Sequence, residues 1–442
     1  MKTSNDLTTG NVRKTLIKYA IPMVLTSIMQ SMYSIIDMII VGRFIGGTAV
    51  SGINNGSLTM NLLVQIAIGF TVGGNILIGQ YFGSKDTEQA KKATGTLFAF
   101  SITAGLVATF VFYMLSENLM ILLGAPALEE ATTYLRTCSL GITFIFAYNA
   151  LNASLRAVGN SKKPFHFIAC ATVLNIILDI LFVAIFKMGV FGAAFATLLS
   201  QCFSFLLALR YVYKNREDMG LVKKYIKIDT QKIKLILKYG FPIALQMTIA
   251  SISWLGVAYL FNKYGADVSA GNGISNKIKD FCQLFLSAMS SAGATMIAQN
   301  LGAKEYKRAE QVMKECMKIT LTIATITIVI AQLFAPQLVS IFITEPEVAT
   351  HAITNLRIEI IAQLFYAGFY SYNILATGSG HTMFVMANSF LNCIVVRLVL
   401  AIFLESQIGL NGIYFACMIA PLSSVPVGYF FYRTKKWQSI AS

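Results

Sequence analysis

The sequence predicts an all-α polytopic membrane protein with twelve transmembrane helices in two parallel six-helix lobes. Three observations lead to this class. Of the 442 residues, 56% are hydrophobic and only 12% are charged. No single soluble core could bury so much apolar surface. The net charge of +15 sits in a few short connections, as the positive-inside rule predicts, so it indicates membrane topology and no nucleic-acid partner. The third observation is an internal repeat, described below.

Twelve stretches satisfy the requirement of about twenty mostly apolar residues for each membrane span. They run over 15–42, 52–80, 93–115, 132–156, 164–186, 190–213, 234–261, 270–299, 313–335, 350–376, 382–404 and 410–432. The first span is too long for the core of a signal peptide and lacks a clear small-residue cleavage site, so we expect it to be retained. An even number of spans places both termini on one side of the membrane.

The connections between these spans fall into two sets by charge. One set is basic, including Lys85, the run from Lys214 to Lys238, and Arg433. Basic connections face the cytoplasm. The other set carries few basic residues beyond Arg43, Lys187 and Lys263, and its acids are Glu117, Glu129, Glu130, Asp267, Glu345, Glu347 and Glu405. The sequence therefore predicts a multi-pass protein of the cytoplasmic (inner) membrane with both termini in the cytoplasm.

Four short blocks recur in order with a period near 219 residues. Lys18-Tyr-Ala-Ile-Pro22 returns as Lys238-Tyr-Gly-Phe-Pro242, and the blocks starting at Gly79, Ala157 and Gly189 return at Ala298, Ala376 and Gly409. Each unit has six spans, so both copies start on the same side and must be parallel. The expected organisation is an N-lobe over 1–213, a cytoplasmic linker over 214–233 and a C-lobe over 234–442. Parallel six-helix repeats are a transporter arrangement, with substrate bound between two lobes.

Three carboxylates lie deep within apolar stretches. They are Asp37 in the first span, Asp179 in the fifth and Asp280 in the eighth. A carboxylate near the bilayer centre costs several kcal/mol unless it faces a cavity or a partner. These groups are therefore candidate functional residues. The alternative for Asp37 and Asp179 is that they are neutral or hydrogen-bonded packing groups that fix helix register.

Several motifs together resemble the multidrug and toxic compound extrusion (MATE) family. They are the Asp-x-x-x-Val-Gly end of the first span (Asp37 to Gly42), the Gly-Gln-x-x-Gly-Ser-Lys loop ending at Lys85 with its echo ending at Lys304, and the stretch from Leu155 to Pro164. The resemblance covers the whole chain. It implies the fold of the multidrug/oligosaccharidyl-lipid/polysaccharide exporters: a monomer of two six-helix bundles in a V shape, driven by inward movement of Na⁺ or H⁺.

The resemblance also implies a cation site in the N-lobe, made by Asp37, Asn175, Asp179 and Thr197. Asn175 and Asp179 are four residues apart and lie on one helix face, so their oxygens can point at one ion. A small hard cation prefers several oxygen ligands. Gln30, Asn152 and Tyr134 would complete the polar cluster.

The coupling ion stays open at this point. Two carboxylates close together in a low-dielectric cavity suit a proton as well as Na⁺, and no other cofactor is expected. Pro22 removes a backbone hydrogen bond within the first span and favours a bend. The resemblance implies that this helix bends as the cation site changes occupancy, which makes Pro22 a candidate gating residue. Its repeat mate Pro242 leaves open an inherited kink with no gating role.

The C-lobe carries its own charges in apolar stretches. Lys277 and Asp280 are one helical turn apart and can form a structural pair. In the competing reading, Asp280 binds a cationic drug or the coupling ion, as carboxylates in this lobe do in other branches of the family. We expect Arg397 to pair with a carbonyl group or with Glu405, and assign it no transport role.

The substrate cavity should be lined by aromatic, methionine and amide side chains, which suit flat lipophilic cations. Any one of them can equally be a packing residue. The candidates are Gln30, Tyr33, Asn61, Gln65, Tyr134, Asn149, Asn152, Gln246, Met247 and Asp280, with Met29, Met32 and Tyr148 as further possibilities.

Three functions compete at the level of sequence. The first is a cation-coupled antiporter that exports lipophilic, often cationic, drugs or toxic compounds by alternating access. The second, a lipid-linked oligosaccharide flippase of the same superfamily, would need a strongly basic cavity for pyrophosphate, and the buried acids of the N-lobe argue against it. The third is an integral membrane enzyme. The histidines His166, His351 and His381 are scattered singly, so the sequence favours a protein that is not an enzyme.

Overall fold

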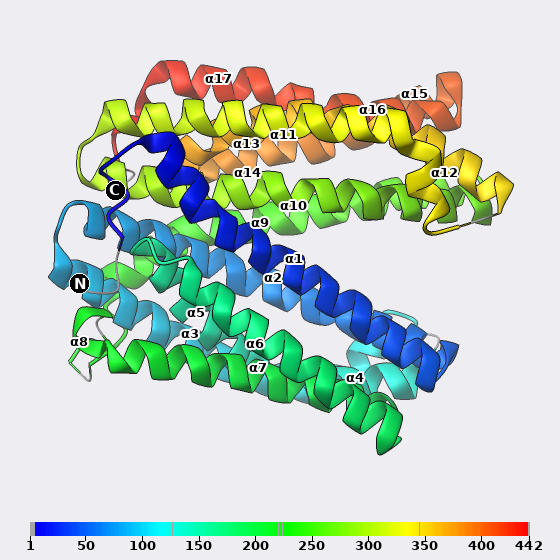
Figure 1. The fold of residues 1–442 in the computed structure, drawn as a ribbon, viewed down its shortest axis with the longest axis horizontal. Helices are drawn as coiled ribbons and strands as arrows, with labels where there is room; N and C mark the ends of the chain where they lie inside the picture. The colour runs from blue at the N-terminus through cyan, green and yellow to red at the C-terminus, as the bar shows by residue number, and fades with distance from the viewer. Residues whose placement is uncertain (1–4, 126, 220, 223, 344, 441–442) are drawn as a thin grey trace. The chain divides into compact units, whose positions relative to one another are not determined.

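The chain folds into long helices in the computed structural model, which describes residues 5–125, 127–219, 221–222, 224–343 and 345–440 (Figure 1). Within these ranges, ten helices are long and apolar enough to cross a membrane. They are α1 (Val12–Phe44), α2 (Gly47–Gly83), α3 (Thr87–Leu122), α6 (Lys162–Asp179) with the π-helix η1 (Ile180–Ile185), α7 (Gly189–Lys214), α9 (Thr230–Asn262), α10 (Ala266–Gly302), α11 (Tyr306–Ser340), α14 (Thr382–Phe390) with η2 (Leu391–Leu398) and α15 (Val399–Ile408), and α16 (Leu410–Ile419) with η3 (Ala420–Ser423) and α17 (Ser424–Thr434).

The two remaining predicted spans are each divided into two helices. The predicted span 132–156 consists of α4 (Leu128–Ser139) and α5 (Ile142–Ala157), which meet at 49°. The predicted span 350–376 consists of α12 (Pro346–Glu359) and α13 (Ala362–Gly378). Each break is closed by hydrogen bonds between residues three apart, such as Gly141 N to Cys138 O (2.9 Å) and Gln363 N to Ile360 O (3.0 Å). The fold class is confirmed, and the described residues hold ten spans, or eleven with the bent pair.

Two of the repeated sequence blocks form the same turn. The loops after α2 and α10 place Lys85 and Lys304 in the left-handed backbone region, with φ of 61° and 60°. The Lys85 and Lys304 N–H groups donate to carbonyl groups three residues earlier, at 3.1 and 3.0 Å. A non-glycine residue in this region is uncommon. The sequence repeat therefore corresponds to a repeat of local backbone structure.

By packing, the described chain divides into two units. Unit 1 contains Ile21–Ala244 together with residues 5–6, and unit 2 contains Leu7–Ala20 and residues 245–440. Helices α1 and α9 are each divided between the units, and both divisions fall within two residues of the internal prolines Pro22 and Pro242. The lobe boundaries predicted from the helix count, 1–213 and 234–442, remain a prediction.

Small residues bring α2 and the first half of α9 close together within unit 1. A Cβ atom added at Gly73 would lie 2.6 Å from the Gly240 backbone nitrogen, and one at Gly69 would lie 2.6 Å from the Cα atom of Ala244. Gly69 and Gly73 are four residues apart, as are Gly240 and Ala244. This is the small-x-x-x-small pattern by which membrane helices pack backbone to backbone.

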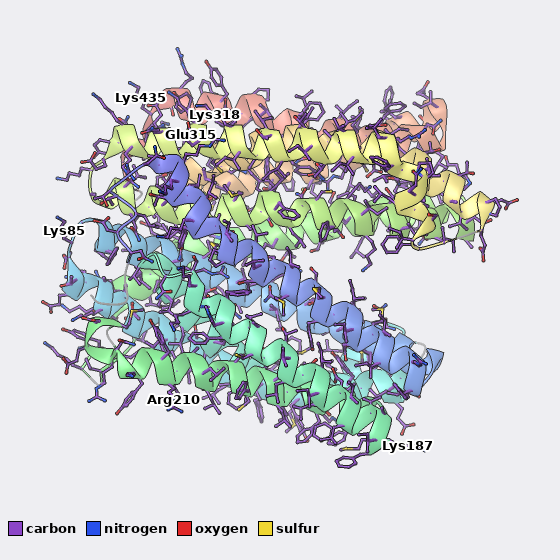
Figure 2. All side chains as sticks on the ribbon, viewed as in Figure 1. Lys85, Lys187, Arg210, Glu315, Lys318 and Lys435 are labelled. Atoms are coloured by element: carbon purple, nitrogen blue, oxygen red, sulfur yellow. The ribbon has the colours of Figure 1, made fainter. Side chains whose placement is uncertain are left out.

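The labelled lysines of unit 1 follow the charge sets of the sequence. Lys85, from the basic set, and Lys187, from the other set, lie at opposite ends of the unit 1 helices (Figure 2). The placement agrees with the two sets lying on opposite sides of a membrane.

Replacing Gly73 by alanine should lower the melting temperature of the purified protein in detergent. The added methyl group meets the backbone of α9, which cannot move aside as a flexible side chain does. Gly273→Ala is the matched control, because a Cβ atom at this α10 position meets nothing within 4 Å, and alanine favours helix over glycine. Equal melting temperatures for the two variants would contradict the close packing of α2 against α9.

Candidate functional site

A cavity of about 420 Å³ lies within unit 1. Its walls come from α1, α2, α4, α5, α6 and α7 and from the break between α4 and α5. The lining includes seven of the residues predicted from sequence: Gln30, Tyr33, Asp37, Asn61, Tyr134, Asn175 and Thr197. The structure thus brings together polar groups that are far apart in the chain.

The acids beside this cavity are buried without partners. Asp37 is 8% exposed and Asp179 is fully buried. Asp37 Oδ1 and both carboxylate oxygens of Asp179 have no hydrogen-bond partner among the described residues. The same holds for both amide atoms of Asn175, which is 1% exposed. Buried polar groups are normally hydrogen-bonded, and each exception calls for an explanation.

Helix geometry explains how these groups meet. Asn175 and Asp179 lie one turn apart on α6, and the π-helix η1 begins directly after Asp179. Single π-helical turns within α-helices occur frequently at functional sites. Across from them, Asp37 on α1 interacts electrostatically with Asp179. Asp179 itself is not part of the cavity lining.

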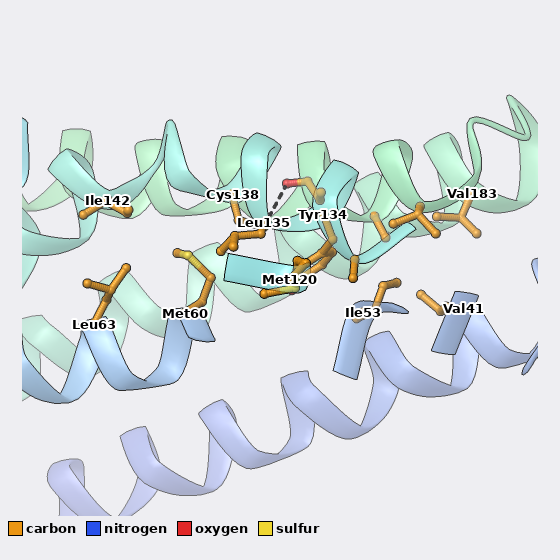
Figure 3. Close-up of a cluster of buried hydrophobic side chains, with 14 of the residues drawn as sticks. Val41, Ile53, Met60, Leu63, Met120, Tyr134, Leu135, Cys138, Ile142 and Val183 are labelled. Atoms are coloured by element: carbon orange, nitrogen blue, oxygen red, sulfur yellow. Dashed lines mark hydrogen bonds between the residues drawn. The ribbon is translucent and has the colours of Figure 1, made fainter. Parts of the chain in front are cut away.

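Hydroxyl groups adjoin the carboxylates. The Tyr33 hydroxyl and the Thr197 Oγ1 lie 3.0 Å apart in a hydrogen bond that joins α1 to α7. Tyr33 also interacts electrostatically with Asp37 and Asp179. Tyr134 lines the cavity and belongs to the adjacent apolar core with Met60 (Figure 3). The apolar core therefore holds this polar group in place.

Five predicted cavity residues line neither this cavity nor a smaller one in unit 2, described below, which Asp280 lines. They are Gln65, Asn149, Asn152, Gln246 and Met247. Asn149 donates instead to the Ile145 carbonyl oxygen at 2.8 Å, and Gln246 and Met247 belong to unit 2. Asn152 is 8% exposed, and its Oδ1 has no hydrogen-bond partner among the described residues.

Sequence reasoning missed several polar lining residues on α7. Ser200, Gln201 and Ser204 follow Thr197 by three, four and seven positions and line the same cavity. That spacing places them on one helix face. The sequence shows this spacing, so the assignment of Thr197 to the site could have predicted that these residues line the same cavity.

The predicted Lys277–Asp280 pair is wrong. Lys279 forms an ion pair with Glu359 of α12, and both side chains are buried. Lys277 and Asp280 are exposed and make no ion pair with each other in the part of the chain that the structure describes. Asp280 lines a second cavity, of about 90 Å³ within unit 2, together with Lys279 and Glu359. Sequence reasoning missed Glu359 because it counted the residue only as part of an apolar span.

The expected partners of Arg397 are also wrong. The Arg397 guanidinium, 1% exposed, donates to the Tyr366 hydroxyl at 2.7 Å and to Ser253 Oγ at 3.5 Å. It lies 4.4 Å from the centre of the Trp254 ring. Glu405 pairs with Lys263 instead, at 3.7 Å. The face of an aromatic ring and two hydroxyl acceptors take the place of the carbonyl group or carboxylate that we expected.

Pro22 lies within α1, which continues through it from Val12 to Phe44. The Pro22 carbonyl oxygen accepts a hydrogen bond from the Thr26 hydroxyl at 2.8 Å. A proline removes one backbone hydrogen bond from its helix. The gating role stays a prediction.

The unit 1 site presents oxygen atoms to a cation. Asp37, Asp179 and Asn175 all have oxygens without partners, and Thr197 adds a hydroxyl beside them. Among the described residues, no group of three His, Cys, Asp or Glu side chains could hold a metal ion. A cation at this site would have the amide and hydroxyl oxygens as ligands in addition to the two acids.

The chain matches a known protein family twice, once in each half of the sequence. The MatE family model matches residues 22–181 and again 242–403. Two relatives from Bacillus subtilis are named probable multidrug resistance proteins. YoeA is 29% identical over 357 residues, covering 79% of this chain and 77% of the relative. YpnP is 28% identical over 439 residues, covering 98% of each. The multidrug export protein MepA of Staphylococcus saprophyticus is 26% identical, covering 93% of this chain and 91% of the relative.

Solved structures share the fold. An outward-facing conformation of a multidrug resistance MATE family transporter superimposes with a TM-score of 0.92 and 22% identity over 97% of each chain. A MATE structure in the bent conformation gives the same TM-score and identity, covering 97% of this chain and 96% of the other. At this identity the likeness concerns the fold alone.

Asp179→Asn should preserve or raise the melting temperature, because it removes a buried charge that has no partner. Glu359→Gln is the contrasting variant. It leaves the buried Lys279 ammonium unpaired, and breaking a buried pair costs about 3–5 kcal/mol, so its melting temperature should fall. Thermal unfolding in detergent measures both. A fall for Asp179→Asn as large as that for Glu359→Gln would make Asp179 a structural group.

Proposed function

This chain belongs to the MatE family, and from that premise we propose that it exports lipophilic, often cationic, drugs or toxic compounds by alternating access in exchange for an inward-moving cation, Na⁺ or H⁺. Its relatives are named as multidrug resistance and multidrug export proteins. The export direction and the breadth of substrates come to this chain from them. The coupling step rests on the chain's own residues.

One observation carries the proposal: the unit 1 cavity adjoins two buried acids, and no lysine or arginine is among the described residues that line it. Asp37 and Asp179 interact with one another, and three of their oxygens have no hydrogen-bond partner in the described structure. Buried charge of one sign is expensive unless a counter-charge is present. A cation that enters the cavity supplies that counter-charge.

We assign the cation site to Asp37, Asn175, Asp179 and Thr197. The two carboxylates supply the charge, and the Asn175 amide and the Thr197 hydroxyl supply further oxygen ligands. The Tyr33 hydroxyl, bonded to Thr197 at 3.0 Å, orients this group. If the ion is a proton, the two acids alone hold it.

The same cavity offers a surface for the exported compound. Tyr33, Tyr134, Met38 and Met60 present aromatic faces and flexible thioethers, with Gln30 and Asn61 as polar anchors. Because a cationic compound and the coupling ion would neutralise the same two carboxylates, binding of one weakens binding of the other. Such competition is what antiport requires. Movement of α1 about Pro22 would change the shape of the cavity, since α1 supplies one wall.

Further features of the proposal follow the topology. The chain acts as a monomer in the cytoplasmic membrane, with both termini in the cytoplasm, and moves its substrates without chemical change. The ten apolar helices of membrane-spanning length support the multi-pass arrangement.

Asp37→Asn and Asp179→Asn should each abolish coupled efflux of a cationic dye from cells, because each removes half of the negative charge at the proposed site. Efflux is followed by dye fluorescence. Asp267→Asn is the matched control, since Asp267 is an exposed carboxylate at the start of α10, and it should transport like the parent. Undiminished efflux in both cavity variants, with all three proteins inserted at equal levels, would remove these acids from the coupling step.

Vesicles reconstituted with the purified protein should identify the ion. An imposed Na⁺ gradient drives dye movement if the acids coordinate Na⁺ with Asn175 and Thr197, whereas an imposed pH gradient drives it if the acids exchange a proton. Thr197→Val separates the two further, because loss of an oxygen ligand weakens Na⁺ coupling more than proton coupling. Dye movement that responds to neither gradient would contradict cation coupling.

A further inference from the structure

The unit 2 cavity contains charges that the proposed export cycle does not use. Its volume is about 90 Å³, and its walls come from α9, α10, α12, α13 and α16. Lys279 and Glu359 line it, and both are more than nine-tenths buried. The space is large enough for a small polar group, since a water molecule takes about 30 Å³ of liquid volume.

The Lys279 ammonium donates to two acceptors, one of which is itself fixed by further hydrogen bonds. It donates to Glu359 Oε2 and to Asn355 Oδ1, the latter at 3.1 Å. Asn355 is itself fixed, because its Nδ2 donates to Asn272 Oδ1 at 3.1 Å and its Oδ1 accepts from Ser275 Oγ at 2.9 Å. The amide oxygen that faces Lys279 is thereby oriented by two neighbours. Such support is typical of a site in which a ligand position has been fixed in advance.

Further acceptors in the same cavity lack donors. Glu359 Oε1, Gln363 Oε1 and Gln283 Oε1 have no hydrogen-bond partner among the described residues, and Glu359 and Gln363 are each 3% exposed. The Gln283 amide is oriented by its donation to the Tyr370 hydroxyl at 2.9 Å. An excess of oxygen acceptors selects N–H donors, and an ammonium group offers three.

We propose that the unit 2 cavity is a binding site for an organic ammonium group, and that the Lys279 side chain is its resident, tethered ligand. The lysine ammonium takes the position that the amino group of a primary amine would take, against Glu359 and Asn355. Glu359 is thereby neutralised from within the chain and is closed to the coupling cation. In unit 1, by contrast, no lysine or arginine is among the described residues that line the cavity.

Removing the tether should make the site available to a free amine. Lys279→Ala deletes three methylene groups and the ammonium, which is the composition of propylammonium. In detergent, propylammonium chloride should raise the melting temperature of Lys279→Ala saturably, and leave that of the parent protein unchanged. Tetramethylammonium, which has no N–H donor, should have no effect on either. No shift in Lys279→Ala, or an equal shift in the parent, would overturn the proposal.

Removal of the Glu359 carboxylate tests where propylammonium binds. In Lys279→Ala/Glu359→Gln, the propylammonium shift should be lost, because Glu359, the carboxylate that contacts the ammonium, is gone while Asp280 of the same lining is kept. A shift of the same size in the double variant would place amine binding elsewhere and overturn the proposal. This binding experiment requires no transport, so its outcome is independent of whether unit 1 couples efflux to a cation.

Variants that change the charges in pairs test whether Lys279 keeps the coupling cation away from Glu359. Lys279→Met and Glu359→Gln alone should each reduce dye efflux by about tenfold or more, because each leaves an uncompensated buried charge. Lys279→Met/Glu359→Gln removes both charges and should recover efflux to near the parent level. A double variant with a parent-like melting temperature and no efflux would show that Glu359 carries an exchangeable cation, contrary to the proposal.

Discussion

A charged side chain within an apolar, low-dielectric interior must meet an opposite charge or lose much stability. This constraint distinguishes the two halves of the molecule. In unit 2, the buried charges are satisfied from within: Lys279 pairs with Glu359, and Arg397 lies over Trp254 and donates to hydroxyl groups. In unit 1, Asp37 and Asp179 interact electrostatically with one another, and three of their oxygens have no hydrogen-bond partner among the described residues. Unit 2 thus contains a buried ion pair, whereas the two acids of unit 1 make no ion pair among the described residues.

The internal repeat allows the buried charges of the two units to be compared at equivalent positions. Arg397 falls beside the repeat position of Asp179, and its partner Ser253 is the repeat counterpart of Tyr33. In unit 2 a built-in guanidinium therefore joins α9 to η2, whereas the corresponding helices of unit 1, α1 and α6, place the acids Asp37 and Asp179 beside the cavity. The two halves keep the same turns, as the left-handed Lys85 and Lys304 show, but differ in the sign of the charge that they enclose.

Much of the fold and part of the site could be predicted from the sequence, for identifiable reasons. Apolar length located the spans, and the i, i+4 spacing of Asn175 and Asp179 placed both on one face of α6. The remaining side-chain contacts depend on which helices pack together, and the sequence does not show this. Glu359 lies on the predicted span 350–376, but its partner Lys279 is eighty residues away, and no local pattern selects it over the nearer Asp280. Arg397 likewise contacts an aromatic ring and hydroxyl groups on other helices. In the described structure it does not pair with Glu405, which lies just after the same predicted span.

The unpartnered oxygens of Asp37 and Asp179 have a consequence for the folded state as a whole. A cation that binds them in the native protein and finds no such site in the unfolded chain shifts the folding equilibrium by mass action. Conformational stability and transport thus become two readouts of one thermodynamic linkage. The ion that the protein binds at these acids would then also raise its free energy of unfolding.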